Sequence, residues 1–205
     1  MVLGLLVLAD LGARRASEAQ LEQRILDSAP SAHDASVHLD SFPFLGRLAV
    51  SGNVPEVRAS VADVTVQGLR LNRIAVDLHD VHIDRDRLVV HRQIDLKSIG
   101  RGLATAEVTQ ADLRSALNGL PVVLGKDRIS VTVRGVTATV TATVRDNVVH
   151  LSAGRLSIPP FTIPKLPLLP CVTNAVSEPG RLHLSCEVAQ VPEELLRQVN
   201  RRIAA

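Results

Sequence analysis

The side chains best suited to chemistry gather in a few short segments of this 205-residue chain. His79, His82 and Asp84 together could hold a metal ion, because imidazole and carboxylate groups are common metal ligands. On a strand, however, residues 79 and 82 point to opposite faces unless a β-bulge separates them. The spacing therefore favours a solvated polar surface, and we predict no metal site.

A phosphate-binding loop is also not indicated. The segment from Gly119 to Asp127 (GLPVVLGKD) has five residues between its glycines instead of four, and Asp127 stands where Mg²⁺ requires a hydroxyl group. The sequence contains no GxSxG, HExxH or paired CxxC motif. We therefore expect no enzyme and no cofactor; a lipid hydrolase or transferase would need a polar cluster inside the fold that the sequence does not reveal.

The two cysteines, Cys171 and Cys186, flank a turn-like segment from Ser177 to Gly180. A disulfide that closes a loop of about 15 residues contributes about 3 kcal/mol in the chain-entropy model. We predict this bridge, with two buried free thiols as the alternative. A disulfide indicates an exported protein.

The composition limits the classes of ligand. Hydrophobic residues make up 46% of the chain, but aromatic residues only 1%, with no Tyr and no Trp. Proteins that stack bases or sugars normally need aromatic platforms, and the net charge of +2 is spread along the chain. Nucleic acid is therefore not an expected partner, and the core must be built from Val, Leu, Ile and Ala.

The N-terminal segment, Met1 to Leu11, is apolar but too short to span a bilayer, which takes about 20 apolar residues. We interpret residues 1–15 as a truncated signal peptide or membrane anchor, and residues 16–205 as a single lipid-binding domain. A buried N-terminal strand or helix is the alternative. The expected location is the periplasm or cell envelope, either anchored to the cytoplasmic membrane or released.

Three segments have the periodicity of amphipathic helices: residues 16–29, 109–118 with Thr109 as the cap, and 192–205. From about Ser36 to Val108 the apolar period is two, which is typical of strands. The apolar set changes parity between Val61 and Ala62 and again between Leu78 and Val81. Such changes predict β-bulges, and bulged strands make a curled sheet.

Residues 129–144 alternate most clearly, and we interpret them as one strand kinked at Gly135, followed by a turn at Asp146-Asn147 and a returning strand. The apolar face of the strand over residues 129–144 carries small side chains that form no hydrogen bonds, so acyl chains could lie along this face. The predicted lipid-binding residues of this trough and of an opposing strand are Val131, Val133, Val136, Ala138, Val140, Ala142, Ile74, Val76 and Leu78. Tight packing of helix on sheet, with no room left, is the alternative.

Two further apolar segments have open interpretations. Phe42, Phe44 and Leu45 form a candidate rim or membrane contact, or else a local core plug. The proline-rich segment from Ile158 to Pro170 is either an extended segment packed on an apolar surface or a polyproline ligand.

Several segments together resemble the actinobacterial LmeA-type phospholipid-binding family, over most of Ala16 to Ala205. They are SFPFLGRL (41–48), VTQADL (108–113), VRGV (133–136) and the segment from Ile158 to Pro192, which contains the two cysteines. The resemblance implies a tubular-lipid-binding-like fold, distantly similar to bactericidal permeability-increasing proteins. It also implies an exported protein that binds phospholipids such as phosphatidylinositol species and serves mannolipid assembly in the envelope. The truncated-looking N-terminus departs from the family's usual anchor.

We therefore expect an α+β fold: a long, strongly curved antiparallel sheet wrapped around one or two amphipathic helices. The predicted partners are phospholipid and a membrane surface. The competing hypothesis is a structural or interaction protein of the envelope that carries no ligand.

Overall fold

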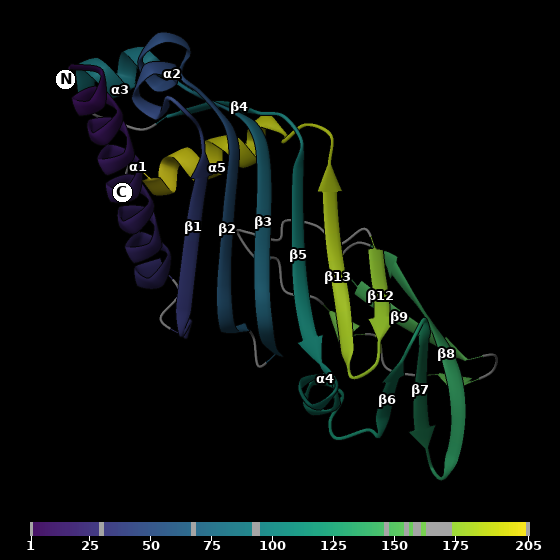
Figure 1. Cartoon of the computed structure of the whole chain (residues 1–205). Helices are drawn as coiled ribbons and strands as arrows, with labels where there is room; N and C mark the ends of the chain where they lie inside the picture. The colour runs from purple at the N-terminus through teal and green to yellow at the C-terminus, as the bar shows by residue number, and fades with distance from the viewer. Residues whose placement is uncertain are drawn as a thin grey trace.

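The computed structural model describes residues 2–28, 31–66, 69–91, 95–145, 148–153, 156–157, 161–162 and 174–203 (Figure 1). Its helices are α1 (Val2–Ser28), α2 (Phe44–Ser51), α3 (Arg85–His91), α4 (Gln110–Ala116) and α5 (Glu193–Ile203). Its longer strands are β1 (Asp34–Asp40), β2 (Asn53–Val66), β3 (Leu69–Ile83), β5 (Gly102–Thr109), β7 (Arg128–Val133), β8 (Val136–Arg145), β9 (Val148–Ala153) and β13 (Arg181–Val188). The shorter ones are β4 (Leu96–Ile99), β6 (Val122–Gly125), β10 (Leu156–Ser157), β11 (Phe161–Thr162) and β12 (Asn174–Glu178).

The strands form two antiparallel sheets. The large sheet has the order β1-β2-β3-β5-β13-β12, with β4 added to β3, and the small sheet has the order β10-β9-β8-β7-β6, with β11 added to β9. The large sheet curves without closing (Figure 1). The expectation of an α+β fold built on a long, curved antiparallel sheet is therefore confirmed.

The predicted β-bulges at the two parity changes are not found between β2 and β3, which keep one register along their whole pairing; β3 shifts register only between His82 and Ile83, where it pairs with β4. The backbone is nevertheless irregular at both parity changes. Asp63 and Asp80 have φ angles of 55° and 54°, in the left-handed region that regular strands do not use. On either side of Asp63, both Val61 and Val64 remain buried, so the irregularity keeps the apolar face of β2 toward the core.

The prediction of one kinked strand over residues 129–144 is wrong. Residues 128–133 and 136–145 are two strands, β7 and β8, which pair with each other and place Val133 opposite Val136. Arg134 and Gly135 form the turn with φ angles of 50° and 81°, the combination that a tight two-residue hairpin loop requires. The strand that was expected to return, residues 148–153, is β9 and does pair with β8, while the turn at Asp146-Asn147 lies outside the described residues.

The helix α1 is longer than the sequence predicts and lies against the free edge of the large sheet. It runs unbroken from Val2, although the pattern indicated a start near residue 16. Its Glu22 and Glu18 side chains accept hydrogen bonds from the backbone N–H groups of Val37 and Leu39, at 2.9 and 2.8 Å. These carboxylates occupy the place of a neighbouring strand, and they shield an edge that could otherwise pair with another chain.

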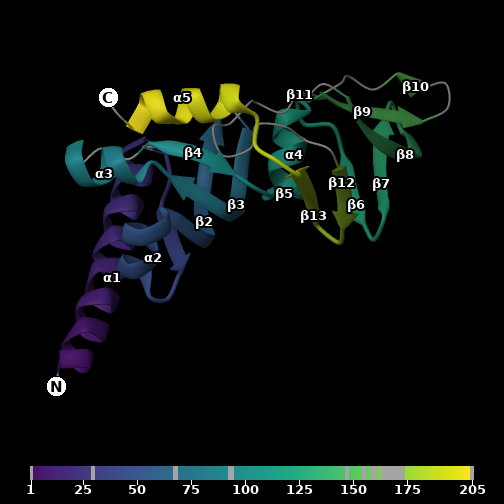
Figure 2. The same cartoon turned by 90° about the horizontal axis from the view of Figure 1, so that it is seen from above.

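The helices α4 and α5 lie where the sequence predicts them. The Thr109 hydroxyl accepts a hydrogen bond from the backbone N–H of Asp112 at 3.2 Å and caps α4. The Asn200 side chain accepts from the backbone N–H of Leu96 and donates to its carbonyl, at 2.8 and 2.9 Å, and so fixes α5 beside β4 (Figure 2). Among the described helices, none is long and apolar enough to cross a membrane.

Candidate functional site

The apolar face of the large sheet, here called the inner face, is the candidate site. Paired residues on neighbouring strands form three aliphatic rows across it. One row is Leu39, Val57, Leu78, Gly102 and Val188, the second is Val37, Ala59, Val76, Ala104 and Cys186, and the third is Ala35, Val61, Ile74, Ala106 and Leu184. Small residues occupy the middle of the face, because β5 contributes only Gly102, Ala104 and Ala106 to the rows.

Gly102 shows how closely side chains approach one another at the middle of this face. A Cβ atom at this position would lie 3.2 Å from Cγ2 of Val188 and 3.4 Å from Cδ2 of Leu78. Neighbours from β3 and β13 therefore already fill the space above the glycine, and any larger residue would push them apart.

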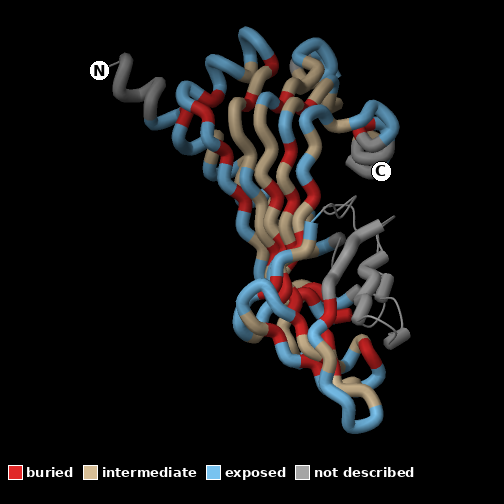
Figure 3. Tube along the Cα trace, turned by 90° about the vertical axis from the view of Figure 1, so that its right-hand side faces the viewer, coloured by how far each residue is buried: buried red, intermediate tan, exposed pale blue. Residues whose placement is uncertain are grey.

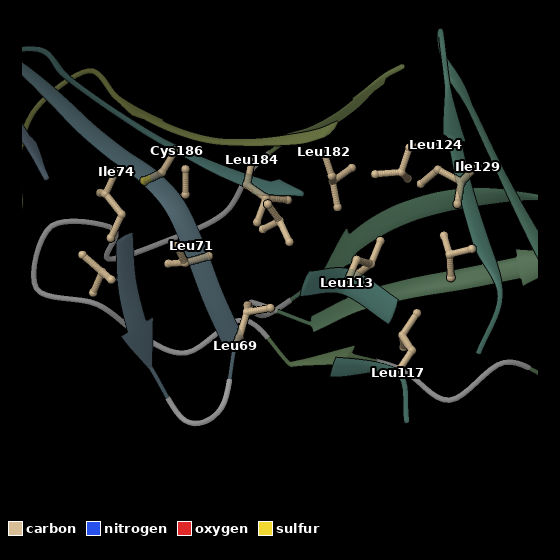
Figure 4. Packing of buried hydrophobic residues seen from close by; sticks show 14 of the residues in the cluster. Leu69, Leu71, Ile74, Leu113, Leu117, Leu124, Ile129, Leu182, Leu184 and Cys186 are labelled. Carbon is tan, nitrogen blue, oxygen red and sulfur yellow. The ribbon is translucent and has the colours of Figure 1, made fainter. Parts of the chain in front are cut away.

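Two clusters of buried side chains bound the face. At one end, Leu196 of α5 and Phe44 of α2 pack with Val54, Val81 and Ile99. At the other end, Leu113 of α4 and Leu117, which caps the C-terminus of this helix, pack with residues of β6, β7, β8 and β13 (Figure 4). Figure 3 shows buried residues gathered where the large sheet meets the small one.

Between these clusters runs a half-buried strip, here called the central strip: Val57, Ala59, Leu78 and Val188. It is entirely aliphatic. The buried polar residues in the described part of the chain are Asp10, Ser41 and Ser177, which lie on other elements, and Ser177 donates its hydroxyl proton to the Gly125 carbonyl at 2.9 Å. The strip can therefore make dispersion contacts with a ligand, and it has no polar group that would need a hydrogen bond from that ligand.

The structure brings part of the predicted trough together. Ile74, Val76 and Leu78 lie side by side on the inner face, and Val131 and Val140 are buried in the cluster that also contains Ile74 and Val76. The hairpin face of β7 and β8 is occupied by α4 and β6 side chains, so on that side the alternative of tight packing describes the structure better.

The other residues of the hairpin lie less deep. Val133 is partly buried against the same cluster, Ala138 is half-buried, and Val136 is 59% exposed because it directly follows the turn. Nothing is described of the Ala142 side chain. Val57 and Ala59 are not among the predicted lipid-binding residues, although they alternate with polar neighbours along β2.

The expected rim separates into two kinds of residue. Phe44 is 5% exposed and belongs to the cluster under α2, in agreement with the alternative of a local core plug. Phe42 and Leu45 are 60% and 43% exposed, so these two remain candidates for contact with a partner.

Asp84, one of the three residues considered for a metal, has a structural role. One of its carboxylate oxygens accepts hydrogen bonds from the backbone N–H groups of Asp86 and Arg87, at 3.0 and 3.1 Å, at the start of α3. The N–H of Arg87, followed by the Lys97 ammonium group at 3.4 Å, lowers the pKa of this carboxyl group. Within the part of the chain that is described, no cluster of His, Cys, Asp and Glu is arranged to hold a metal ion.

We expect Asp84→Asn to lower the melting temperature at pH 7 by a few degrees at most, because the carboxylate is partly exposed and solvent screens its interactions. The lowered pKa means that the folded state prefers the carboxylate. Its contribution is therefore present above the ordinary pKa of 3.8 and is lost as the pH falls through the lower pKa of the folded state. Thermal unfolding of both proteins from pH 7 to pH 2 checks this, and a difference that persists at the lowest pH would contradict it.

The predicted disulfide has one described end. Cys186 is fully buried in the second row of the inner face, between Leu184 and Val188 along β13. Cys171 and most of the proline-rich segment 158–170 lie outside the described residues, so the pairing stays a prediction.

Comparison with known proteins identifies one family. The LmeA-like phospholipid-binding family matches residues 8–199, which is most of the chain. No curated protein and no solved structure matches the sequence or the fold.

Proposed function

Because the chain belongs to the LmeA-like phospholipid-binding family, we propose that it holds the acyl chains of a phospholipid against the central strip of the inner face. The family is named for lipid binding and not for an enzymatic activity. The observation that carries the proposal is the strip itself: Val57, Ala59, Leu78 and Val188 are contiguous, aliphatic and half-buried, between two ends that are fully packed.

The chemistry of the strip suits an acyl chain. Each methylene group removed from water stabilises the bound state by about 0.8 kcal/mol. Because the wall of the strip is aliphatic, an acyl chain bound there leaves no polar group of the protein without a hydrogen-bond partner. Small side chains beside the strip, such as Ala104 and Ala106, keep the face shallow enough for a chain to lie on it. The phosphate-bearing headgroup would stay at the surface, where Arg side chains can pair with it.

We further propose that the protein works outside the cytoplasm, at or near the cytoplasmic membrane, and carries lipid for mannolipid assembly in the envelope. The family resemblance and the predicted disulfide support this location, since disulfides persist in oxidising compartments.

Native mass spectrometry of the full chain purified from its host tests the binding. We expect mass increments that match phospholipid, together with uptake of lipid from vesicles. A bare chain that takes up no lipid would contradict the proposal and favour a structural envelope protein without a ligand.

A further inference from the structure

We propose that the end of the molecule formed by α2 and α3 docks on the surface of an anionic phospholipid bilayer. Four exposed apolar residues define this docking end: Phe42, Leu45, Val50 and Val90, which are 60%, 43%, 77% and 70% exposed. Large exposed apolar side chains that gather on neighbouring elements mark an interaction surface. This inference rests on the proposed function, because it assigns the place where lipid would enter or leave.

The helix α2 has two distinct faces. Phe44 and Leu48, four residues apart, pack into the cluster beneath the helix. Leu45 and Val50 do not belong to that cluster, and a large part of their apolar surface faces solvent. An amphipathic helix that leaves such a face in water suits insertion into the headgroup region of a bilayer.

Hydrogen bonds from α1 and α3 fix the backbone of α2, which carries the apolar side chains of the docking end. The buried Asp10 carboxylate of α1 accepts hydrogen bonds from the backbone N–H groups of Phe44 and Leu45, at 2.9 and 2.6 Å. On the other side, the Arg85 guanidinium donates to the Val50 carbonyl at 3.4 Å. Three helices therefore meet here, and Figure 1 shows α1, α2 and α3 together at the end of the molecule opposite β6, β7 and β8.

Charge favours an anionic partner. Every acidic residue on α3 and its flanks has a cationic partner: Asp84 pairs with Lys97, Asp86 with Arg85, and Asp95 with Arg87. Arg47 is exposed on α2 between Leu45 and Val50, and in the described part of the chain it forms no ion pair. At the surface of the docking end, Arg47 is therefore an exposed cation amid apolar side chains, while the Asp10 carboxylate beneath it is buried and hydrogen-bonded to backbone N–H groups. An exposed cation among apolar side chains suits phosphate headgroups above acyl chains.

The docking end also adjoins the candidate lipid site. Leu48 of α2 packs against the same cluster as Val57 and Leu78 of the central strip. A lipid that leaves a bilayer at α2 would have a short, apolar path to the strip. This continuity favours a bilayer over a second protein as the occupant.

Flotation of the full chain with vesicles tests the docking end. We expect binding to phosphatidylcholine vesicles that contain phosphatidylglycerol, and at least a tenfold loss of binding for Leu45→Asp combined with Val50→Asp. Arg47→Glu should weaken binding to the anionic vesicles about fivefold and binding to pure phosphatidylcholine much less. The matched control is Val123→Asp combined with Val136→Asp, two exposed positions at the opposite end, which should bind like the unchanged protein.

Further outcomes separate this inference from the proposed function. The Leu45/Val50 variant should still take up a dispersed lysophospholipid, which needs no bilayer. Unchanged flotation of that variant would overturn the docking end but not the central strip. Self-association that depends on Val50, without vesicle binding, would also overturn it and identify a second copy of the chain as the occupant. Circular dichroism and thermal unfolding of each variant establish that it folds.

Discussion

Ala59→Trp should lower the uptake of phospholipid at least tenfold while the protein remains folded. Ala59 lies in the central strip, opposite Val37 on one side and Val76 on the other. Because it is half-buried, an indole at this position can extend over the strip instead of being forced into the closed core. It would then occupy the space along which we place an acyl chain. The measurement is the amount of lipid bound after incubation with vesicles and gel filtration.

The matched control is Ala75→Trp. Ala75 is also half-buried but lies on the opposite face of β3, between Ser60 and Thr105, because its neighbours Ile74 and Val76 both point to the inner face. This variant should retain nearly all of the uptake, and Ala59→Leu should give an intermediate value. Equal losses in the two Trp variants, or no loss in either, would contradict the placement of the lipid.

The second large effect concerns the two cysteines. If Cys171 and Cys186 are bonded, Cys171→Ala should lower the free energy of unfolding by about 3 kcal/mol. For a chain of this size, that corresponds to a fall of about 6–12 °C in the melting temperature. A reducing agent should produce the same fall in the unchanged protein and no further change in the variant, because both treatments remove the same bond.

Alkylation gives an independent check of the disulfide. The unfolded, unreduced protein should take up no thiol reagent, and after reduction it should take up two equivalents. Two adducts without reduction would show free thiols and would remove the disulfide as support for export.

The parts of the fold that the sequence predicts correctly depend on local patterns. The Thr109 cap of α4 and the apolar stripe of α5 are contained in their own residues. The parity changes correctly locate the backbone irregularities at Asp63 and Asp80, although not a change of register between β2 and β3. The turn between Ser177 and Gly180 likewise follows from Pro179 and Gly180, and it joins β12 to β13.

The errors arise where two geometries give the same pattern. A kinked strand and a tight hairpin both shift the apolar set by one position after Arg134-Gly135, so the alternation on either side could not separate them. The positive φ angle of Arg134, which is unusual for a residue other than glycine, distinguishes the hairpin from a kinked strand.

The sequence predicts the kind of surface that forms the candidate site, but not which strands carry that surface. Small aliphatic side chains occur on both β3 and the β7–β8 hairpin, and periodicity cannot tell which of these faces another element covers. Leu113 of α4 and the cap residue Leu117 cover the hairpin side, whereas Val57 and Leu78 remain half-buried. That distinction depends on contacts between elements far apart in the sequence.

The most direct test of the lipid site uses a phospholipid with a photoreactive diazirine in its acyl chain. After uptake and illumination of the full chain, mass spectrometry of its peptides locates the adducts. We predict adducts on β2, β3 and β13 at Val57, Ala59, Leu78 or Val188, and their loss in Ala59→Trp. Adducts confined to residues of the opposite face, such as Ser60 and Ala75, would contradict the placement of phospholipid on the inner face.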